Sequence, residues 1–175
     1  MKILSATLRD IPLIRQIAEE AFPATYRNIL SKEQIDYMME WMYSEQSLRR
    51  QMKEEAHAYF ILFDESSAPC GYVSIRPEKE RLYHLEKIYL LPSYQGKGYG
   101  TLLFSHAVDY VKGHCPGNAP VGIELNVNRH NPAYLFYRKM GMIQVREGDF
   151  EIGNGYYMND YIMRLEVRRE IPYTI

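Results

Sequence analysis

The amino-acid sequence predicts one mixed α/β domain that covers residues 1–175. A length of 175 residues is ordinary for a single domain. The spacing of apolar residues is helical up to about residue 53, and from Ala58 onward segments rich in β-formers alternate with further helical segments. No linker, repeat or low-complexity segment divides this pattern, so one folding unit of helices and strands is expected.

Helices dominate the N-terminal part, after one short strand over residues 2–6. Ser31 and Gln34 form a capping-box pattern that marks the start of the second helix. The first helix should end near Phe22 and Pro23, because a proline has no N–H to donate inside a helix. The helices expected here begin after Asp10 (with Pro12 in the first turn), after Ser31, and over residues 45–53.

Strands dominate the remainder. A cluster of turn-forming residues over 64–69 should join two strands into a hairpin. Gly113 is expected to cap the first helix of this part, and Gly141 to end the second. The expected strands are 58–63, 71–76, 82–91, 121–127, 142–146 and 156–167, and the helices run from 98 to 112 and from Asn131 to Gly141.

Composition excludes several classes of function. The net charge of −1 and the isoelectric point of about 6.5 give no general attraction to nucleic acid or to an anionic membrane. No apolar run reaches the roughly 18 residues of a membrane span, and Arg9 and Asp10 interrupt any signal-peptide core. Cys70 and Cys115 are isolated, with no metal-ligand or redox spacing, so reduced thiols in a cytoplasmic protein are expected.

The most informative segment is the glycine-rich stretch Gln95–Gly100, which lies between a predicted strand and a predicted helix. Backbone N–H groups and the positive end of a helix dipole bind phosphate at such a place. A Walker loop is excluded, because Leu91 stands where its first glycine is needed and Gly98 where its Ser or Thr is needed. A dinucleotide fingerprint is excluded as well, because Thr101 and Leu103 occupy its third glycine position in the two possible registers.

Together with a second segment, this loop resembles the GNAT superfamily of N-acetyltransferases. Gln95 to Gly100 fits the pattern Gln/Arg-x-x-Gly-x-Gly of that family's pyrophosphate loop. About 30 residues later a strand ends in Leu-x-Val, an Asn opens a helix, and Tyr-x-x-x-Gly follows. The interval from that Asn to the Tyr is one residue shorter than in many members, and Met142 replaces the usual Phe. The residues that carry this second match are Leu125, Val127, Asn131, Ala133, Tyr137 and Gly141.

The resemblance implies a GNAT fold, in which a mixed, mostly antiparallel sheet is flanked by helices on both faces. It implies acetyl-coenzyme A as the cofactor, direct transfer of acetyl to a primary amine, and a homodimer. Backbone groups of the strand before the loop are expected to pair with the pantetheine arm as an added strand does. The residues expected to contact the coenzyme are Ile88, Tyr89, Leu90, Gln95, Gly96, Lys97, Gly98, Tyr99, Gly100, Thr101, Asn126, Asn131 and Tyr134.

Catalysis of this reaction needs an acid for the leaving thiolate and a base for the amine, whose ammonium form has a pKa near 10.4. Tyr137 occupies the family's tyrosine position and is the expected acid. Strict alternation along the strand over residues 82–91 would place His84, Glu86, Ile88 and Leu90 on one face. Glu86 and His84 are the two candidates for the base, and the sequence leaves both open.

The acceptor is the least determined part of the prediction. Aromatic segments around Tyr26 and Trp41, and the ending around Asp160, look similar to bacterial spermidine-type N-acetyltransferases. These three residues are the expected acceptor contacts. Two alternatives stay open: an acetyltransferase that acts on a protein or peptide amine, and a silent sensor that binds acetyl-coenzyme A without chemistry.

Overall fold

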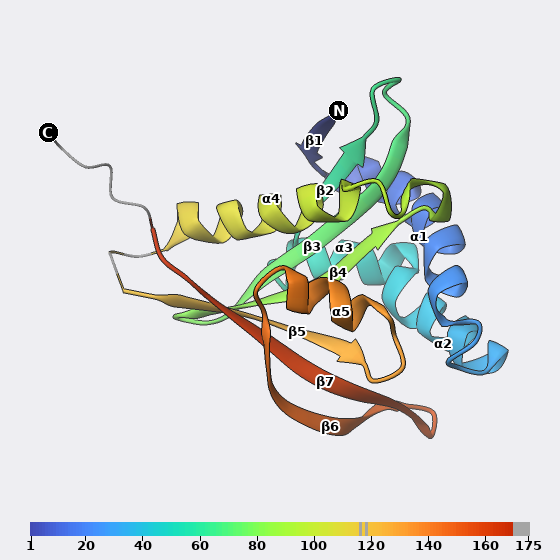
Figure 1. Ribbon diagram of the computed structural model, residues 1–175. Coiled ribbons are helices and arrows are strands. Elements are labelled where there is room, and N and C mark those ends of the chain that lie inside the picture. The colour runs from blue at the N-terminus through green and yellow to red at the C-terminus, as the bar shows by residue number, and fades with distance from the viewer. Residues whose placement is uncertain (116, 118, 170–175) are drawn as a thin grey trace, which may run out of the picture.

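The computed structural model describes residues 1–169 except 116 and 118, and in this part a seven-stranded mixed sheet carries helices on both faces (Figure 1). The order of strands in the sheet is β1-β2-β3-β4-β5-β7-β6. The predicted fold class is confirmed. The elements are β1 (Lys2–Ser5), η1 (Leu8–Asp10), α1 (Ile11–Tyr26), α2 (Lys32–Tyr43), α3 (Glu45–Lys53), β2 (Ala58–Phe63), β3 (Pro69–Lys79), β4 (Leu82–Leu90), η2 (Pro92–Tyr94), α4 (Tyr99–His114), β5 (Val121–Asn128), α5 (Ala133–Lys139), β6 (Ile143–Gly153) and β7 (Tyr156–Val167).

Each face of the sheet has its own apolar core. The helices α4 and α5 cover one face, where Leu103 and Tyr137 join a cluster that includes Val73 of the sheet. The helices α1, α2 and α3 cover the other face, where Phe22 and Leu48 join a second cluster. None of the helices in the described ranges has the length and apolar character to cross a membrane.

The structure corrects two of the predicted helix ends and one predicted capping box. Pro23 lies inside α1, which continues to Tyr26, so the expected end at Phe22 and Pro23 is wrong. Gly113 also lies inside its helix, and the cap of α4 is Cys115. Ser31 caps α2 as expected, but the Gln34 side chain donates to the Tyr157 carbonyl instead of completing a capping box. Tertiary contacts outweigh the local signal in each case.

The strands β4 and β5 are parallel neighbours for only a short length. Residues Leu82–His84 pair with Gly122–Glu124, and beyond this point no pairing joins the two strands, while every other pair of neighbouring strands is antiparallel. On its other side β4 stays paired with β3, and β5 stays paired with β7. The sheet therefore opens between β4 and β5 along their C-terminal halves.

A β-bulge at Glu86 changes which side chains of β4 share a face. Ser74 of β3 lies opposite Lys87 and Ile75 lies opposite Leu85, so Glu86 is the additional residue. Leu85 and Ile88 consequently both join the α4 core, three residues apart. The predicted common face for all four alternating residues of this strand is therefore wrong, because a bulge shifts the alternation by one residue.

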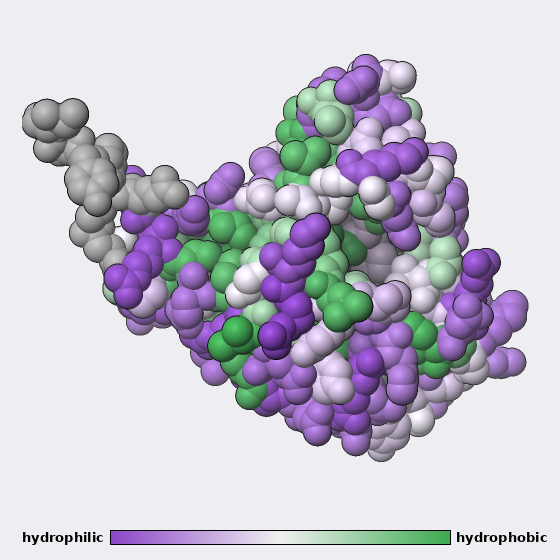
Figure 2. All heavy atoms as spheres, in the orientation of Figure 1, coloured by the Kyte–Doolittle hydropathy of each residue, from purple (hydrophilic) through white to green (hydrophobic). Residues whose placement is uncertain are grey.

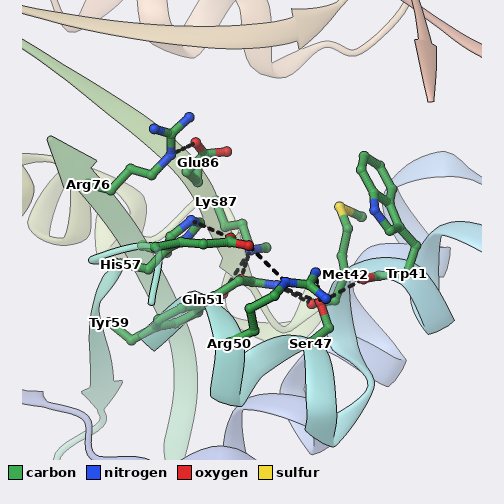
Figure 3. A network of polar contacts seen from close by, with 12 residues as sticks. Trp41, Met42, Ser47, Arg50, Gln51, His57, Tyr59, Arg76, Glu86 and Lys87 are labelled. Carbon is green, nitrogen blue, oxygen red and sulfur yellow. Dashed lines mark hydrogen bonds and ion pairs between the residues drawn. The ribbon is translucent and has the colours of Figure 1, made fainter. Parts of the chain in front are cut away.

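The residue after the bulge is a buried lysine that links β4 to α3 and β2 (Figure 3). The Lys87 ammonium donates to the side-chain oxygen of Gln51 at 2.6 Å and to the hydroxyl of Tyr59 at 2.7 Å. The Gln51 amide in turn donates to the Met42 carbonyl at 2.8 Å. Burial lowers the pKa of Lys87 to about 8, because the cation is held by neutral oxygens instead of a carboxylate.

We expect the stability of the protein to rise with pH above 8 because of Lys87. The folded-state pKa of about 8 lies below the unfolded value of 10.5, so the unfolded chain holds the extra proton between these pH values. Stability should rise in this window by at most about 1.4 kcal/mol per pH unit. Urea unfolding at pH 7, 8, 9 and 9.5 measures this, with Lys87→Met as the matched variant that lacks the rise. Parallel curves for the two proteins would contradict the lowered pKa.

Candidate functional site

A cavity of about 1130 Å³ occupies the opening between β4 and β5. Its walls come from the end of α1, the C-terminal half of β4, the glycine loop, the end of β5 and the start of α5. In the orientation of Figure 1, Figure 2 shows this face hollowed beside α5, with apolar residues around the hollow. The parting of the two strands therefore creates a cavity that is lined by segments far apart in sequence.

The glycine loop supplies one end of this cavity. Gly96 and Gly98 have φ values of +74° and +85°, in the left-handed region where residues with a Cβ are strained. Gly98 is the N-cap of α4 and offers no side chain to the first N–H groups of that helix. These N–H groups and the helix dipole remain directed at the loop, which fits a bound phosphate.

Gly100 is different, because nothing in the protein itself requires a glycine there. Its φ is outside the positive region, and a Cβ would meet the Phe136 ring at 3.5 Å and the Leu90 side chain at 3.7 Å, which are ordinary contacts. Gly100 lines the cavity. The absence of a side chain at this position therefore leaves room for a ligand, which is a stronger indication of binding than the strained glycines give.

Tyr137 reaches the cavity from α5. Its side chain is 7% exposed and packs against the rings of Phe104 and Phe136. Burial is the main cause that raises the pKa of its hydroxyl above the ordinary value, and the nearby Tyr26 adds to it. Among the described residues, no hydrogen-bond partner is found for this hydroxyl. A protonated, unengaged hydroxyl in a cavity can donate a proton.

Glu86 and His84 have different relations to the cavity. Glu86 lines it and accepts a hydrogen bond of 2.5 Å from Nε of Arg76 (Figure 3). Burial alone would raise the pKa of the Glu86 carboxyl, but the charges of His84, Arg76 and Lys87 hold it below its ordinary value. The His84 ring lies 3.2 Å from the Glu78 carboxylate and is not part of the cavity wall.

A polar wall closes the side of the cavity formed by α1 and β5. Asn131 accepts a hydrogen bond from the Ala133 backbone N–H and lines the cavity, but it lies one residue before the N-cap of α5, which is Pro132 instead of the expected Asn131. The hydroxyls of Tyr26 and Tyr89 lie 3.4 Å apart. Asp160 stands behind this wall, buried on β7, and accepts a hydrogen bond of 3.2 Å from Asn126.

The structure brings most of the sequence-predicted site residues to this cavity, although not all of them line it. Trp41 lies outside it, on α2, where its ring stacks on Tyr37 and is 44% exposed. The predicted residues outside the cavity wall are His84, Lys97, Tyr99, Tyr134, Trp41 and Asp160. The predicted residues that line it are Tyr26, Glu86, Ile88, Tyr89, Leu90, Gln95, Gly96, Gly98, Gly100, Thr101, Asn126, Asn131 and Tyr137.

Sequence reasoning missed several residues of the wall. Asn28 and His130 lie in loops that follow α1 and β5, and neither position carries a motif. Lys87 was missed because strict alternation was assumed for its strand. The sequence does contain a signal, since Glu86 and Lys87 are adjacent polar residues between the apolar Leu85 and Ile88, which is typical of a bulge.

The combination found here is an anion-binding loop, an open strand edge and a protonated tyrosine around one cavity. The loop, with its left-handed glycines and helix N-terminus, fits the pyrophosphate of coenzyme A. The open edge of β4 offers backbone groups to an extended arm such as pantetheine.

Comparisons with known proteins agree with this geometry. A PaiA N-acetyltransferase from Thermoplasma acidophilum, solved in complex with coenzyme A, has a TM-score of 0.75 and 23% identity over 95% of this chain and 100% of that chain. The ribosomal-protein-S18-alanine N-acetyltransferase from Escherichia coli has a TM-score of 0.69 and 18% identity over 99% and 98% of the two chains. A mutant of the spermidine N-acetyltransferase SpeG from Vibrio cholerae has a TM-score of 0.66 and 21% identity over 94% and 92%.

These structures share the fold of this chain, and a family model establishes the relationship. The model described as the acetyltransferase (GNAT) family matches residues 13–142, about three quarters of the sequence. The matched range contains the glycine loop, the bulged strand and Tyr137. The chain therefore belongs to the GNAT family of N-acetyltransferases, enzymes that use acetyl-coenzyme A.

Proposed function

We propose that this protein transfers an acetyl group directly from acetyl-coenzyme A to the primary amine of a small molecule. The observation that carries the proposal is that a single cavity joins the glycine loop, the open edge of β4 and Tyr137. No cysteine lines the cavity in the described part of the chain, and both cysteines are buried elsewhere. This supports attack by the amine itself, without an acetylated enzyme.

The donor end of the cavity is assigned to the residues of the glycine loop and of β4. Backbone N–H groups from Gln95 to Thr101 bind the pyrophosphate, and Lys97 adds positive charge at the rim. Backbone groups of Ile88, Tyr89 and Leu90 pair with the pantetheine arm and hold the thioester oxygen. Asn131 contacts the same arm from the loop before α5. Acetyl-coenzyme A supplies the thioester carbonyl, which forms the new N–C bond as its C–S bond breaks.

Proton transfer is assigned to Tyr137 and Glu86. Tyr137 donates its proton to the departing sulfur, whose pKa is similar to that of a cysteine thiol. Glu86 accepts the amine proton through an ordered water, since it lines the cavity and His84 does not. The lowered pKa of Glu86 keeps its carboxylate ionised at neutral pH, so it can accept a hydrogen bond from that water and orient it toward the amine.

The charges around the cavity favour a small amine over a long polyamine. Glu86 is the one acidic residue among the described residues of the cavity wall, and Arg76 already pairs with it. Of the carboxylates on α1 and α2, Asp36 pairs with Lys32 at 2.5 Å and Glu19 is paired with Arg15 on the surface. A polyamine is the second candidate, favoured by the likeness to SpeG. A homodimer and a cytoplasmic location belong to the same proposal.

The proposal is tested by incubating the protein with acetyl-coenzyme A and separate amines, and by following release of free thiol. The panel contains an aliphatic monoamine, spermidine and a peptide with a free N-terminus. We expect the highest kcat/KM with the monoamine. The highest value with the peptide would favour the protein-directed alternative. Calorimetric binding of the coenzyme without thiol release from any amine would favour the sensor.

We expect Gly100→Ala to weaken binding of coenzyme A while leaving the fold intact. The new Cβ has room in the protein but occupies space that the ligand needs, so the Kd from calorimetry should rise at least tenfold. Gly113→Ala is the matched control, since it lies inside α4 in open space. The control should leave the Kd unchanged and stabilise the helix by about 0.5–1 kcal/mol. An unchanged Kd for Gly100→Ala would remove this loop from the binding site.

Tyr137→Phe should lower kcat by about a hundredfold, the usual effect of losing a general acid. The coenzyme Kd should change less than twofold, because the ring and its packing remain. The variant Tyr110→Phe removes a hydroxyl from α4, outside the cavity wall, and should retain full activity. Equal losses of kcat and of coenzyme affinity in Tyr137→Phe would assign this tyrosine to binding instead of proton transfer.

A further inference from the structure

A pair of side chains at the end of β5 has a role that the assigned machinery does not explain. Asn126 is exposed and lines the cavity, beyond Glu124, the last residue of β5 that pairs with β4. Asp160 lies diagonally across on β7, since Asn128 pairs with Asp160 and Asn126 pairs with Ile162. Asp160 is only 5% exposed, and its Oδ2 accepts a hydrogen bond of 3.2 Å from Asn126 Nδ2.

The carboxylate determines which way the amide of Asn126 points. An ionised carboxylate can only accept hydrogen bonds, so the amide must turn its nitrogen toward Asp160. The Asn126 oxygen then points away from Asp160, on a side chain that is exposed at the cavity. Among the described residues, no donor contacts this oxygen. The cavity therefore contains an oriented hydrogen-bond acceptor whose partner is not part of the protein.

The buried carboxylate of Asp160 has too few hydrogen-bond and charge partners within the protein to compensate its negative charge. Its Oδ1 is buried without a hydrogen-bond partner among the described residues. Burial raises the pKa of the Asp160 carboxyl, and the bond from Asn126 and the charge of Arg129 offset this only in part. Arg129 is engaged with Asp149 at 3.0 Å, and Tyr26 is the other titratable group that the Asp160 charge reaches. A buried, incompletely paired anion favours the approach of a cation.

An ammonium group fits both observations. It has only N–H donors, which match the free Asn126 oxygen, and its positive charge compensates the buried carboxylate behind the amide. A carbonyl or phosphate oxygen of the coenzyme has no donor for the Asn126 oxygen and would be repelled by Asp160. An amide N–H of the pantetheine arm could donate to this oxygen, but it is neutral and would leave the buried Asp160 charge uncompensated. The geometry therefore favours the acceptor amine over the coenzyme as the partner of Asn126, although the family resemblance suggests a coenzyme contact there.

We propose that Asn126 binds the nitrogen of the acceptor amine through its side-chain oxygen, and that Asp160 is the positioning residue that orients this amide and attracts the cationic acceptor. The inference rests on the proposed acetyl transfer. It assigns the acceptor as an amine that arrives as an ammonium ion. The same charge stabilises the positive charge that forms on the nitrogen as it attacks the carbonyl carbon.

The test compares Asn126→Leu, Asp160→Asn and the double variant with the wild type. Each single variant should lower kcat/KM for an aliphatic amine by about tenfold to a hundredfold, as expected when a hydrogen bond to a charged group is lost. The Kd for coenzyme A should stay within twofold. Asn159→Ala, at an exposed position of β7, is the control that should behave as wild type.

Two further readouts separate positioning from a merely structural effect. With an aromatic amine that is uncharged at pH 7, the double variant should be no worse than Asn126→Leu alone, because Asp160 then acts only by orienting Asn126. The loss in Asp160→Asn should be smaller for an aromatic amine that is uncharged at pH 7 than for an aliphatic ammonium. Should Asp160→Asn fail to fold in a thermal scan, Asn126→Leu at its exposed position still decides the amine contact.

Several outcomes would overturn this inference. They are values of kcat/KM within twofold of wild type in Asn126→Leu, losses that multiply in the double variant with the uncharged aromatic amine, or loss of coenzyme affinity in parallel with activity. If the wild type releases thiol and the variants release it equally fast, the Asn126 assignment is overturned and the proposed function is not. A wild-type protein that binds coenzyme but acetylates no amine would overturn the proposed function and this inference with it.

Discussion

The parting of β4 from β5 is the constraint on which the rest of the site depends. The two strands pair as parallel neighbours for three residues each and then diverge. Backbone groups of both strands are left facing a cavity instead of each other, and buried backbone groups require partners. An extended ligand arm with amide groups can supply them. The binding site is thus a place where the sheet is incomplete without its ligand.

Charged groups hold the two strands on either side of this opening. Glu124 is the last residue of β5 that pairs with β4, and its side chain is buried. It accepts hydrogen bonds from Arg146 of β6 at 2.6 Å and from Arg164 of β7 at 3.0 Å. On the other side, Lys87 ties the bulged part of β4 to α3 and β2. Removing one partner from such a buried set is costly, so each strand has a well-defined course up to the cavity.

The fold could be predicted from the sequence because its evidence is local and repeated. The glycine loop between a strand and a helix was predicted from spacing, and Gly96 and Gly98 have the positive φ values that such a loop needs. A helix was also expected from Asn131 to Gly141, and the structure forms it over the shorter range Ala133–Lys139. The bulge was missed because the hydrophobic pattern of one strand is too short to show a shift of one residue. Pro23 was misjudged because packing of Phe22 and Tyr26 on the sheet maintains the helix around it.

The site residues also divide into those that local sequence patterns predict and those that they do not. The loop follows from the spacing of its glycines, and Tyr137 follows from the short motif that resembles the family's. The hydrogen bond between Asn126 and Asp160 joins two residues that are 34 positions apart in the sequence, on β5 and β7, and no local pattern encodes it. Long-range pairs of this kind set the charge at the acceptor end, whereas the local motifs set the donor end.

This division accounts for what the two ends of the cavity can recognise. The donor end uses backbone N–H groups and a helix N-terminus, which are positive and independent of side-chain identity. The acceptor end uses an oriented amide and a buried carboxylate, which are negative and depend on particular side chains. Under the proposed assignment, the opposite signs direct an anionic donor and a cationic acceptor to different parts of one opening in the sheet. A change of acceptor therefore needs only a change of side chains on β5 and β7, while the loop and the fold remain as they are.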